Sequence, residues 1–227
     1  MIELDQVSFS YPQRDVLRGV SLRLVEPRIG IIGGNGSGKS TLARLLNGLV
    51  APTEGRVLVD GLDTRRDLKG VRRKVGFVFQ DPDLQIVMPT VVEDLAFSLR
   101  PLKLPAAERD RLLDETLVKY RLDAHRDHPA HLLSGGQKQL LAIAAVLITN
   151  PSVLVMDEPT TLLDLRNRRA VMRLVAGLEQ QVVMVTHDLD VLADFDRVLV
   201  IDDGRVAADG APAEAIAAYE RLVEARA

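Results

Sequence analysis

The stretch GGNGSGKST, from Gly33 to Thr41, combines flexible glycines with a lysine and hydroxyl side chains. Glycines let successive backbone N–H groups approach phosphate oxygens, because no Cβ stands in the way. With this spacing, Lys39 can reach the β- and γ-phosphates of a nucleotide and Ser40 can offer its hydroxyl to Mg²⁺. We therefore predict a nucleotide-binding loop that uses Gly33, Asn35, Gly36, Ser37, Gly38, Lys39, Ser40 and Thr41.

A second set of reactive groups follows the apolar run VLVMD, which ends in Asp157 and is followed by Glu158. Open α/β sheets bind ligands at the carboxyl ends of their strands, so both carboxylates are expected beside the phosphates. Asp157 can accept hydrogen bonds from the water shell of Mg²⁺, and Glu158 can polarise the attacking water as a general base. This pair predicts hydrolysis of the nucleotide as well as binding.

A third motif, LLSGGQKQ, precedes the strongly apolar segment QLLAIAAVLIT. Its serine hydroxyl and two glycines at the start of a helix describe another anion-binding helix terminus. The residues concerned are Ser134, Gly135, Gly136 and Gln137. One nucleotide has no need of two such cradles, so this motif raises the question of what it binds.

The elements around these motifs alternate between strands and helices. Alternating apolar residues over 2–11 and 20–25 predict an antiparallel layer, and RIGII at 28–32 leads into the glycine loop. Four leucines after the loop, at positions 42, 45, 46 and 49, fall on one face of a predicted helix. From position 152 onward, apolar runs typical of a parallel sheet return, and a short helix is expected from position 211.

The middle of the chain differs in character, with several prolines and a charged helical run, PAAERDRLLDETLVKY. We predict that residues 81–150 form a helical subdomain inserted into a nucleotide-binding α/β core with a β layer, residues 1–80 and 151–227. The fold class is therefore α/β, within one domain spanning residues 1–227.

Composition and sequence pattern limit the kinds of partner and binding site that the chain can have. The net charge of -3 argues against a general nucleic-acid surface, and no nucleic acid is expected as a partner. The absence of cysteine excludes disulfides and thiolate metal sites. No apolar run approaches the roughly 20 residues that cross a bilayer, and the amino terminus does not read as a secretory signal.

In order and spacing, these motifs resemble those of ATP-binding-cassette (ABC) ATPases, with Leu133–Gln137 as the family's signature motif. The resemblance covers nearly the whole chain and implies a P-loop NTPase fold with an antiparallel β layer, a RecA-like parallel core and the inserted helical subdomain. It implies that Tyr11 stacks on adenine and that Gln80 touches Mg²⁺ and the attacking water. It also implies that Asp164 ends the loop that crosses between subunits and that His187 contacts the γ-phosphate.

The same resemblance answers the question of the second cradle. In the family, the signature motif of one subunit binds the nucleotide of the other. The chain therefore resembles half of a head-to-tail dimer that closes on two ATP molecules, and a homodimer is favoured over a pair of different ATPase subunits.

The segment FQDPDLQIVMPTVVEDLAF, residues 79–97, resembles the ATPase subunit of energy-coupling-factor (ECF) transporters, modular importers of vitamins and transition-metal ions. In that family the segment receives a coupling helix of a T-type membrane protein, which works with a small substrate-binding membrane protein. Acidic side chains are expected to give this groove complementary negative charge: Asp81, Asp83, Glu93 and Asp94. The resemblance places the chain peripherally on the cytoplasmic face of the cell membrane.

The sequence is compatible with more than one transporter subtype and with more than one class of ABC protein. The short carboxyl-terminal region and the segment EPTTLLDLRNR, with Leu163 where a small residue is commoner, look most like the biotin-type subunit. Cobalt- or nickel-type and other vitamin importers are the alternatives, and a soluble iron–sulfur-assembly ATPase is the alternative from another class. His125, His128 and His131 suggest metal binding by spacing alone, but Pro129 would break a helix that aligned their rings.

Overall fold

The computed structural model describes residues 1–226, which divide into two compact units. The first contains Met1–Val75, Ser152–Glu158 and the chain from Glu179 onward. The second contains Gly76–Pro151 and Pro159–Leu178. The predicted subdomain limits at residues 81 and 150 stay predictions, and each unit is described by itself below.

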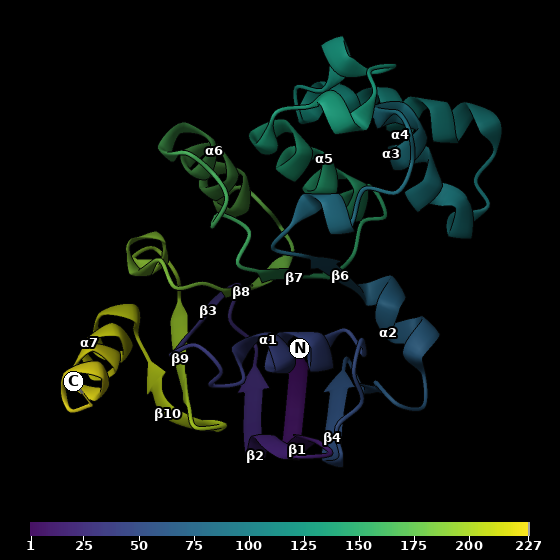
Figure 1. The fold of residues 1–227 in the computed structure, drawn as a ribbon. Helices are drawn as coiled ribbons and strands as arrows, with labels where there is room; N and C mark the ends of the chain where they lie inside the picture. The colour runs from purple at the N-terminus through teal and green to yellow at the C-terminus, as the bar shows by residue number, and fades with distance from the viewer. Residues whose placement is uncertain (227) are drawn as a thin grey trace. The chain divides into compact units, whose positions relative to one another are not determined.

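The first unit begins with an antiparallel sheet in the strand order β2-β1-β4-β5. Figure 1 shows β2, β1 and β4 side by side. In this sheet, β1 pairs with β2 on one side and with β4 on the other, so that Ile2 lies opposite both Leu24 and Val59. Along β1, alternation buries Ile2 and Leu4 and, after a register shift, Val7 and Phe9, so the strand is half-buried as the sequence predicts. The strands are β1 (Ile2–Tyr11), β2 (Arg14–Leu24), β4 (Glu54–Val59) and β5 (Leu62–Asp63).

A second sheet in this unit carries the strand ends with the predicted reactive groups, in the order β10-β9-β3-β8-β7. Neighbouring strands from β9 to β7 run parallel, and β10 pairs antiparallel with β9. Every residue of β7 is buried, and β8 and β9 are buried over most of their length, as β-branched runs in a covered sheet should be. The strands are β3 (Arg28–Ile32), β7 (Val153–Asp157), β8 (Gln181–Val185), β9 (Arg197–Asp202) and β10 (Arg205–Gly210).

The helix after the glycine loop, α1 (Lys39–Leu46), is shorter than the leucine pattern predicts. Leu42, Leu45 and Leu46 are buried as expected, but the prediction for Leu49 was wrong, because its side chain is exposed. The helix ends at Asn47, whose side-chain amide donates to the carbonyl of Val75 at 2.8 Å. The other helices of this unit are α2 (Leu68–Lys74) and α7 (Pro212–Glu224), the latter confirming the predicted terminal helix.

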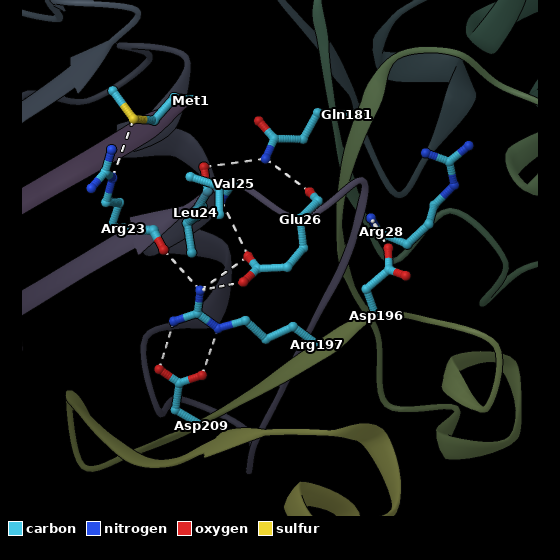
Figure 2. A network of polar contacts seen from close by, with 10 residues as sticks. All are labelled: Met1, Arg23, Leu24, Val25, Glu26, Arg28, Gln181, Asp196, Arg197 and Asp209. Atoms are coloured by element: carbon cyan, nitrogen blue, oxygen red, sulfur yellow. Dashed lines mark hydrogen bonds and ion pairs between the residues drawn. The ribbon is translucent and has the colours of Figure 1, made fainter.

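A polar network around Arg197 holds the segment between the two sheets (Figure 2). The guanidinium of Arg197 forms a two-bond ion pair with Asp209, at 2.6 and 2.7 Å, and also donates to Glu26 and to the carbonyl of Arg23. Gln181 donates from its side chain to the carbonyls of Leu24 and Glu26. These contacts raise the pKa of Arg197 and tie the connection from β2 to β3 to strands β9 and β10.

The second unit is mainly helical, and β6 (Val75–Val78) leads the chain into it. Its central helix α5 is buried along most of its length and packs against both α3 and α6. Three-residue 3₁₀ turns connect the helices. The helices are α3 (Val91–Leu99), α4 (Ala106–Lys119), α5 (Gly135–Leu147) and α6 (Leu165–Ala176). In the described part of the chain, no helix has the length and apolar character needed to span a membrane.

Candidate nucleotide site

The glycine loop lies between β3 and α1, the position that the sequence predicts for it. Gly38 has a φ of 111° and would bring a Cβ within 2.9 Å of the carbonyl oxygen of Val16. Gly33 would place a Cβ only 2.0 Å from the carbonyl of Ile201, so no side chain fits at either position. No side chain caps the start of α1, which leaves its N–H groups available to an anion.

The side chain of Lys39 is folded back onto this loop. Its ammonium donates to the carbonyls of Gly33 and Gly34, at 2.9 and 2.8 Å, and the residue is 6% exposed. Burial lowers the pKa of Lys39, while the nearby carboxylates of Glu158 and Asp157 oppose that shift. A buried cation held mainly by neutral carbonyls would gain from a phosphate, so the loop is built to receive an anion.

A cavity of about 190 Å³ lies between the end of β1 and the glycine loop. Its lining includes Tyr11, Gly36, Lys39 and Thr41. Tyr11 is 49% exposed and meets Phe9 edge-on, with ring centroids 5.0 Å apart, so it is available to stack on a base.

Arg14 is a lining residue that the motifs did not reveal. Its guanidinium donates to the carbonyl of Gly36 at 2.8 Å, which places a positive charge at the rim of the cavity. The signal available in the sequence was a basic residue three positions after Tyr11, where β2 begins after the turn from β1.

The hydroxyl of Ser40 donates to Asp157 at 2.8 Å, so the loop and the end of β7 meet as predicted. Asp157 is 5% exposed, and its burial raises the pKa of the carboxyl group against the opposing effects of Ser40 and Arg44. Arg44, which the motifs also did not reveal, lies 3.8 Å from Asp157. A buried carboxylate beside a hydroxyl is an oxygen donor set of the kind Mg²⁺ prefers, so the residues present fit that ion.

Glu158 and His187 are brought into direct contact. Nδ1 of His187 lies 2.9 Å from Oε2 of Glu158, and the backbone N–H of Glu158 donates to the carbonyl of Val185. Glu158 has a φ of 50°, a left-handed conformation that costs a residue other than glycine on the order of 1–3 kcal/mol. Strain of this kind is typical of sites where geometry matters more than stability.

The signature motif caps α5 in the second unit. The hydroxyl of Ser134 accepts from the N–H of Gln137 at 3.4 Å, and the side-chain oxygen of Gln137 accepts from the N–H of Ser134 at 2.9 Å. Gly135 has open space where a Cβ would stand, whereas a Cβ on Gly136 would lie 2.3 Å from Cγ of Asn167 in α6. Only the first glycine therefore presents a free backbone surface.

The remaining predicted residues also lie in the second unit. Asp164 caps α6 by accepting from the N–H of Asn167 at 2.8 Å, and Leu162, two residues before it, is 63% exposed. Gln80 is exposed, two residues after the end of β6. Nucleotide contacts of Asp164, Gln80 and the signature residues stay predictions. Among residues 1–226, no cluster of three or more metal-binding side chains was found around the histidines or elsewhere.

The prediction that Asp94 adds negative charge to an exposed groove was wrong, because this residue is only 3% exposed. Its carboxylate accepts from the N–H groups of Val87 and Met88, and burial raises its pKa although these bonds oppose the rise. Glu93 closes a capping box with Thr90 at the start of α3. These acids organise the segment before α3, since their carboxylates serve neighbouring donors.

Gln85 fixes the same segment to the signature helix. Its side-chain oxygen accepts from the N–H of Phe79 at 3.2 Å, and its amide donates to the carbonyl of Ala142 in α5 at 2.8 Å. Asp83 adds an ion pair to Lys138 of α5, with the closer oxygen at 2.7 Å. Residues 79–85 are thus tied to the helix that begins with the signature motif.

The chain matches the ABC transporter family model over residues 17–161, so it belongs to the ABC transporter ATP-binding family. A protein of Deinococcus radiodurans described as an ABC transporter ATP-binding protein is 62% identical, over 98% of this chain and 99% of that protein. The biotin transport ATP-binding protein BioM of Rhizobium etli is 46% identical, over 97% and 98%. The energy-coupling factor transporter ATP-binding protein EcfA1 of Symbiobacterium thermophilum is 46% identical, over 93% and 76%.

The solved structures give the same family. CbiO1 from Clostridium perfringens, part of the ABC transporter complex CbiONQ, superposes with a TM-score of 0.85 at 33% identity, covering 98% of this chain and 93% of that one. The predicted fold class, an ABC cassette with an antiparallel layer and a parallel P-loop sheet, is confirmed. The chain is an ATP-binding ABC ATPase whose hydrolysis of ATP is coupled to transport, and the resemblance to ECF-type ATPases is confirmed.

Proposed function

We propose that this chain is the energy-coupling subunit of an ECF-type importer for biotin. The observation that carries the proposal is its similarity to BioM over nearly the full length of both chains. Residues 79–97, which resemble the corresponding segment of ECF transporters, also support the proposal. Gln85 and Asp83 in this segment contact the signature helix, so a partner bound there could act on the signature motif.

Hydrolysis is assigned to the groups at the ends of β7 and β8. Glu158 takes a proton from the attacking water, and His187 orients the Glu158 carboxylate through the 2.9 Å contact. Lys39 exchanges the carbonyls of Gly33 and Gly34 for phosphate oxygens and balances their charge. Tyr11 stacks on the adenine at the other end of the cavity.

Ser40 and Asp157 are the residues that would hold Mg²⁺, with Gln80 as a further predicted ligand. When bound, the ion neutralises charge that develops on the phosphate oxygens. Asp157 orients the Ser40 hydroxyl through the hydrogen bond between them. The two oxygen donors are therefore adjacent and prepared to act together.

A second copy of the chain supplies the other half of each site. Ser134 presents its hydroxyl and Gly135 its backbone N–H at the start of α5, Gln137 closes the capping box, and we assign this motif to the γ-phosphate bound by the opposite subunit. ATP would then favour the closed dimer because it gains contacts there that the open form lacks.

The membrane partners are a T-type coupling protein and a small substrate-binding membrane protein, which would hold the chain on the cytoplasmic face of the membrane. The named alternative is a cobalt- or nickel-type or other vitamin importer, because CbiO1 shares the fold closely. A soluble iron–sulfur-assembly role is disfavoured because BioM and EcfA1, which match over most of their length, are named as transport proteins.

The test is a detergent pull-down of the tagged full chain from its native membrane, followed by mass spectrometry and labelled-biotin binding. Recovery of a T-type protein with a small membrane protein that retains biotin would support the whole proposal. A small membrane protein that retains cobalt or nickel instead would move the chain to the alternative. Recovery of soluble partners only would refute the importer.

A further inference from the structure

A histidine outside the proposed catalytic groups contacts the signature motif. Nε2 of His125, in the 3₁₀ turn Asp123–His125, lies 2.7 Å from the side-chain nitrogen of Gln137. Both side chains are half-buried in the second unit. Nothing in the family resemblance or in the motif spacing pointed to this contact.

The direction of the hydrogen bond follows from the donors present. The backbone N–H of Ser134 can only donate, so the Gln137 atom that receives it at 2.9 Å must be the amide oxygen. The Gln137 amide nitrogen, which has donors only, therefore faces His125. Nε2 of His125 must then be the acceptor, and the ring proton resides on Nδ1.

We propose that His125 is a positioning residue for the signature motif, acting by accepting this hydrogen bond from Gln137. As long as position 125 offers an acceptor, the Gln137 amide keeps its oxygen on Ser134 and the capping box at the start of α5 stays closed. A donor at position 125 forces the amide to turn over, which presents two donors to the Ser134 N–H and opens the cap.

The consequence reaches ATP through Ser134. The cap sets the orientation of the Ser134 hydroxyl and of the N–H groups that the proposed function assigns to the opposite subunit's γ-phosphate. This inference rests on that proposed function. Losing the acceptor should weaken ATP-dependent dimerisation and leave each subunit's own nucleotide affinity unchanged, since the glycine loop belongs to the other unit of the chain.

The neighbouring His128 provides a matched control. Its ring centroid lies 5.4 Å from that of His125, its side chain is exposed, and its ring forms no hydrogen bond within residues 1–226. His128→Lys therefore adds the same charge to the same loop without touching Gln137. His125→Gln keeps an acceptor oxygen near the position of Nε2, whereas His125→Lys offers only donors.

The experiment compares these variants in the full chain that also carries Glu158→Gln, so that ATP-bound dimers accumulate. Dimerisation is followed by analytical ultracentrifugation against MgATP concentration, nucleotide affinity by a fluorescent ATP analogue, and folding by thermal melting. We expect His125→Lys to raise the ATP concentration for half-dimerisation by roughly five- to tenfold, the effect of losing one helix cap. His125→Gln and His128→Lys should stay within about twofold of the parent, with equal affinity for the analogue.

Three outcomes would overturn the inference: His125→Lys dimerises like its parent, His125→Gln is as impaired as His125→Lys, or His128→Lys shows the same defect. Ser134→Arg in the same assay separates this failure from that of the proposed function. If Ser134→Arg abolishes dimerisation while His125→Lys has no effect, only the role of His125 falls. If Ser134→Arg dimerises normally, the shared site itself is refuted, and the role of His125 with it.

Discussion

The imidazole Nδ1 of His187 lies 2.9 Å from Oε2 of Glu158, although twenty-nine positions separate the two residues in the chain. The contact joins the residue after β7 to the loop after β8, two strands that are neighbours in the parallel sheet. The histidine side chain is 59% exposed and that of the glutamate 18%, so the pair lies at the surface of the site where water has access. The motifs assign the two residues separate roles, and the structure places their side chains in direct contact.

Glu158→Gln should reduce the rate of ATP hydrolysis by about 10²–10⁴-fold, because an amide cannot take a proton from water. Nucleotide affinity should remain, since Lys39 and the glycine loop are untouched. Phosphate release under saturating ATP measures the first quantity and a fluorescent analogue the second. An unchanged hydrolysis rate would remove Glu158 from the role of base.

Tyr11→Ala should weaken nucleotide binding by about 1–3 kcal/mol, the range that base stacking on aromatic side chains contributes. Tyr11→Phe should bind normally, because the ring that stacks is retained. Titration with ATP and with inorganic triphosphate tests the reason for the loss. If triphosphate binding falls as much as ATP binding, the effect does not come from the adenine.

Asp157→Asn should stabilise the nucleotide-free protein at neutral pH relative to the wild type. Burial raises the pKa of Asp157 in the folded state, so between the unfolded value, about 3.9, and the raised folded value the folded protein holds more protons. By linkage, this group's contribution to stability is full below the unfolded pKa and is lost as pH rises through the folded pKa.

Urea denaturation at several pH values from about 4 to 7 measures this effect as the difference between wild type and Asp157→Asn. The advantage of the variant should grow with pH. A difference that is constant over this range would show that ionised Asp157 carries no penalty in the fold. Hydrolysis by the variant should be lost in either case, because the substitution removes the proposed acidic ligand of Mg²⁺.

Gly136→Ala should destabilise the chain by about 1–3 kcal/mol, because its Cβ would stand 2.3 Å from Cγ of Asn167. Gly135→Ala is the matched control, since open space surrounds its Cβ position. Combining Gly136→Ala with Asn167→Ala should recover most of the loss in a double-mutant cycle of thermal unfolding. If the two losses simply add, the side chain of Asn167 is not what excludes a larger residue.

Arg197→Met should cost about 1–3 kcal/mol of unfolding free energy, between the values for exposed and fully buried ion pairs. The substitution keeps much of the side-chain volume and leaves the carboxylates of Asp209 and Glu26 without their shared partner (Figure 2). Arg18→Met is the control, because Arg18 and Asp203 form an exposed pair of 41% and 70% side-chain exposure. Equal urea midpoints for the two variants would contradict a stabilising role for the network.

The motifs with fixed short spacing were predictable because their chemistry is local. A glycine loop between a strand and a helix has few other uses, and the strand ending in Asp157 is recognisable by its apolar run. Leu49 was mispredicted because periodicity alone does not show where a helix stops. In the structure, α1 ends at Leu46, and the side chain of the next residue, Asn47, donates to Val75, twenty-eight positions away.

The burial of Asp94 likewise could not be predicted from the sequence. In the sequence it is one of several acids, and only the fold shows that its carboxylate turns inward to two N–H groups. Arg14 was missed for a similar reason, because its partner Gly36 lies twenty-two positions away, in the loop between β3 and α1.

The sequence alone determined the class of chemistry: which residues bind phosphate, which can act as base, and in what order they occur. These features follow from residue type and from spacing within one turn or strand end. The tertiary structure decided which of them act together, because hydrogen bonds such as Glu158 with His187 and Gln137 with His125 depend on approach in space between separate segments. A hydrogen bond requires atoms within about 3 Å, a condition that only the folded chain can set.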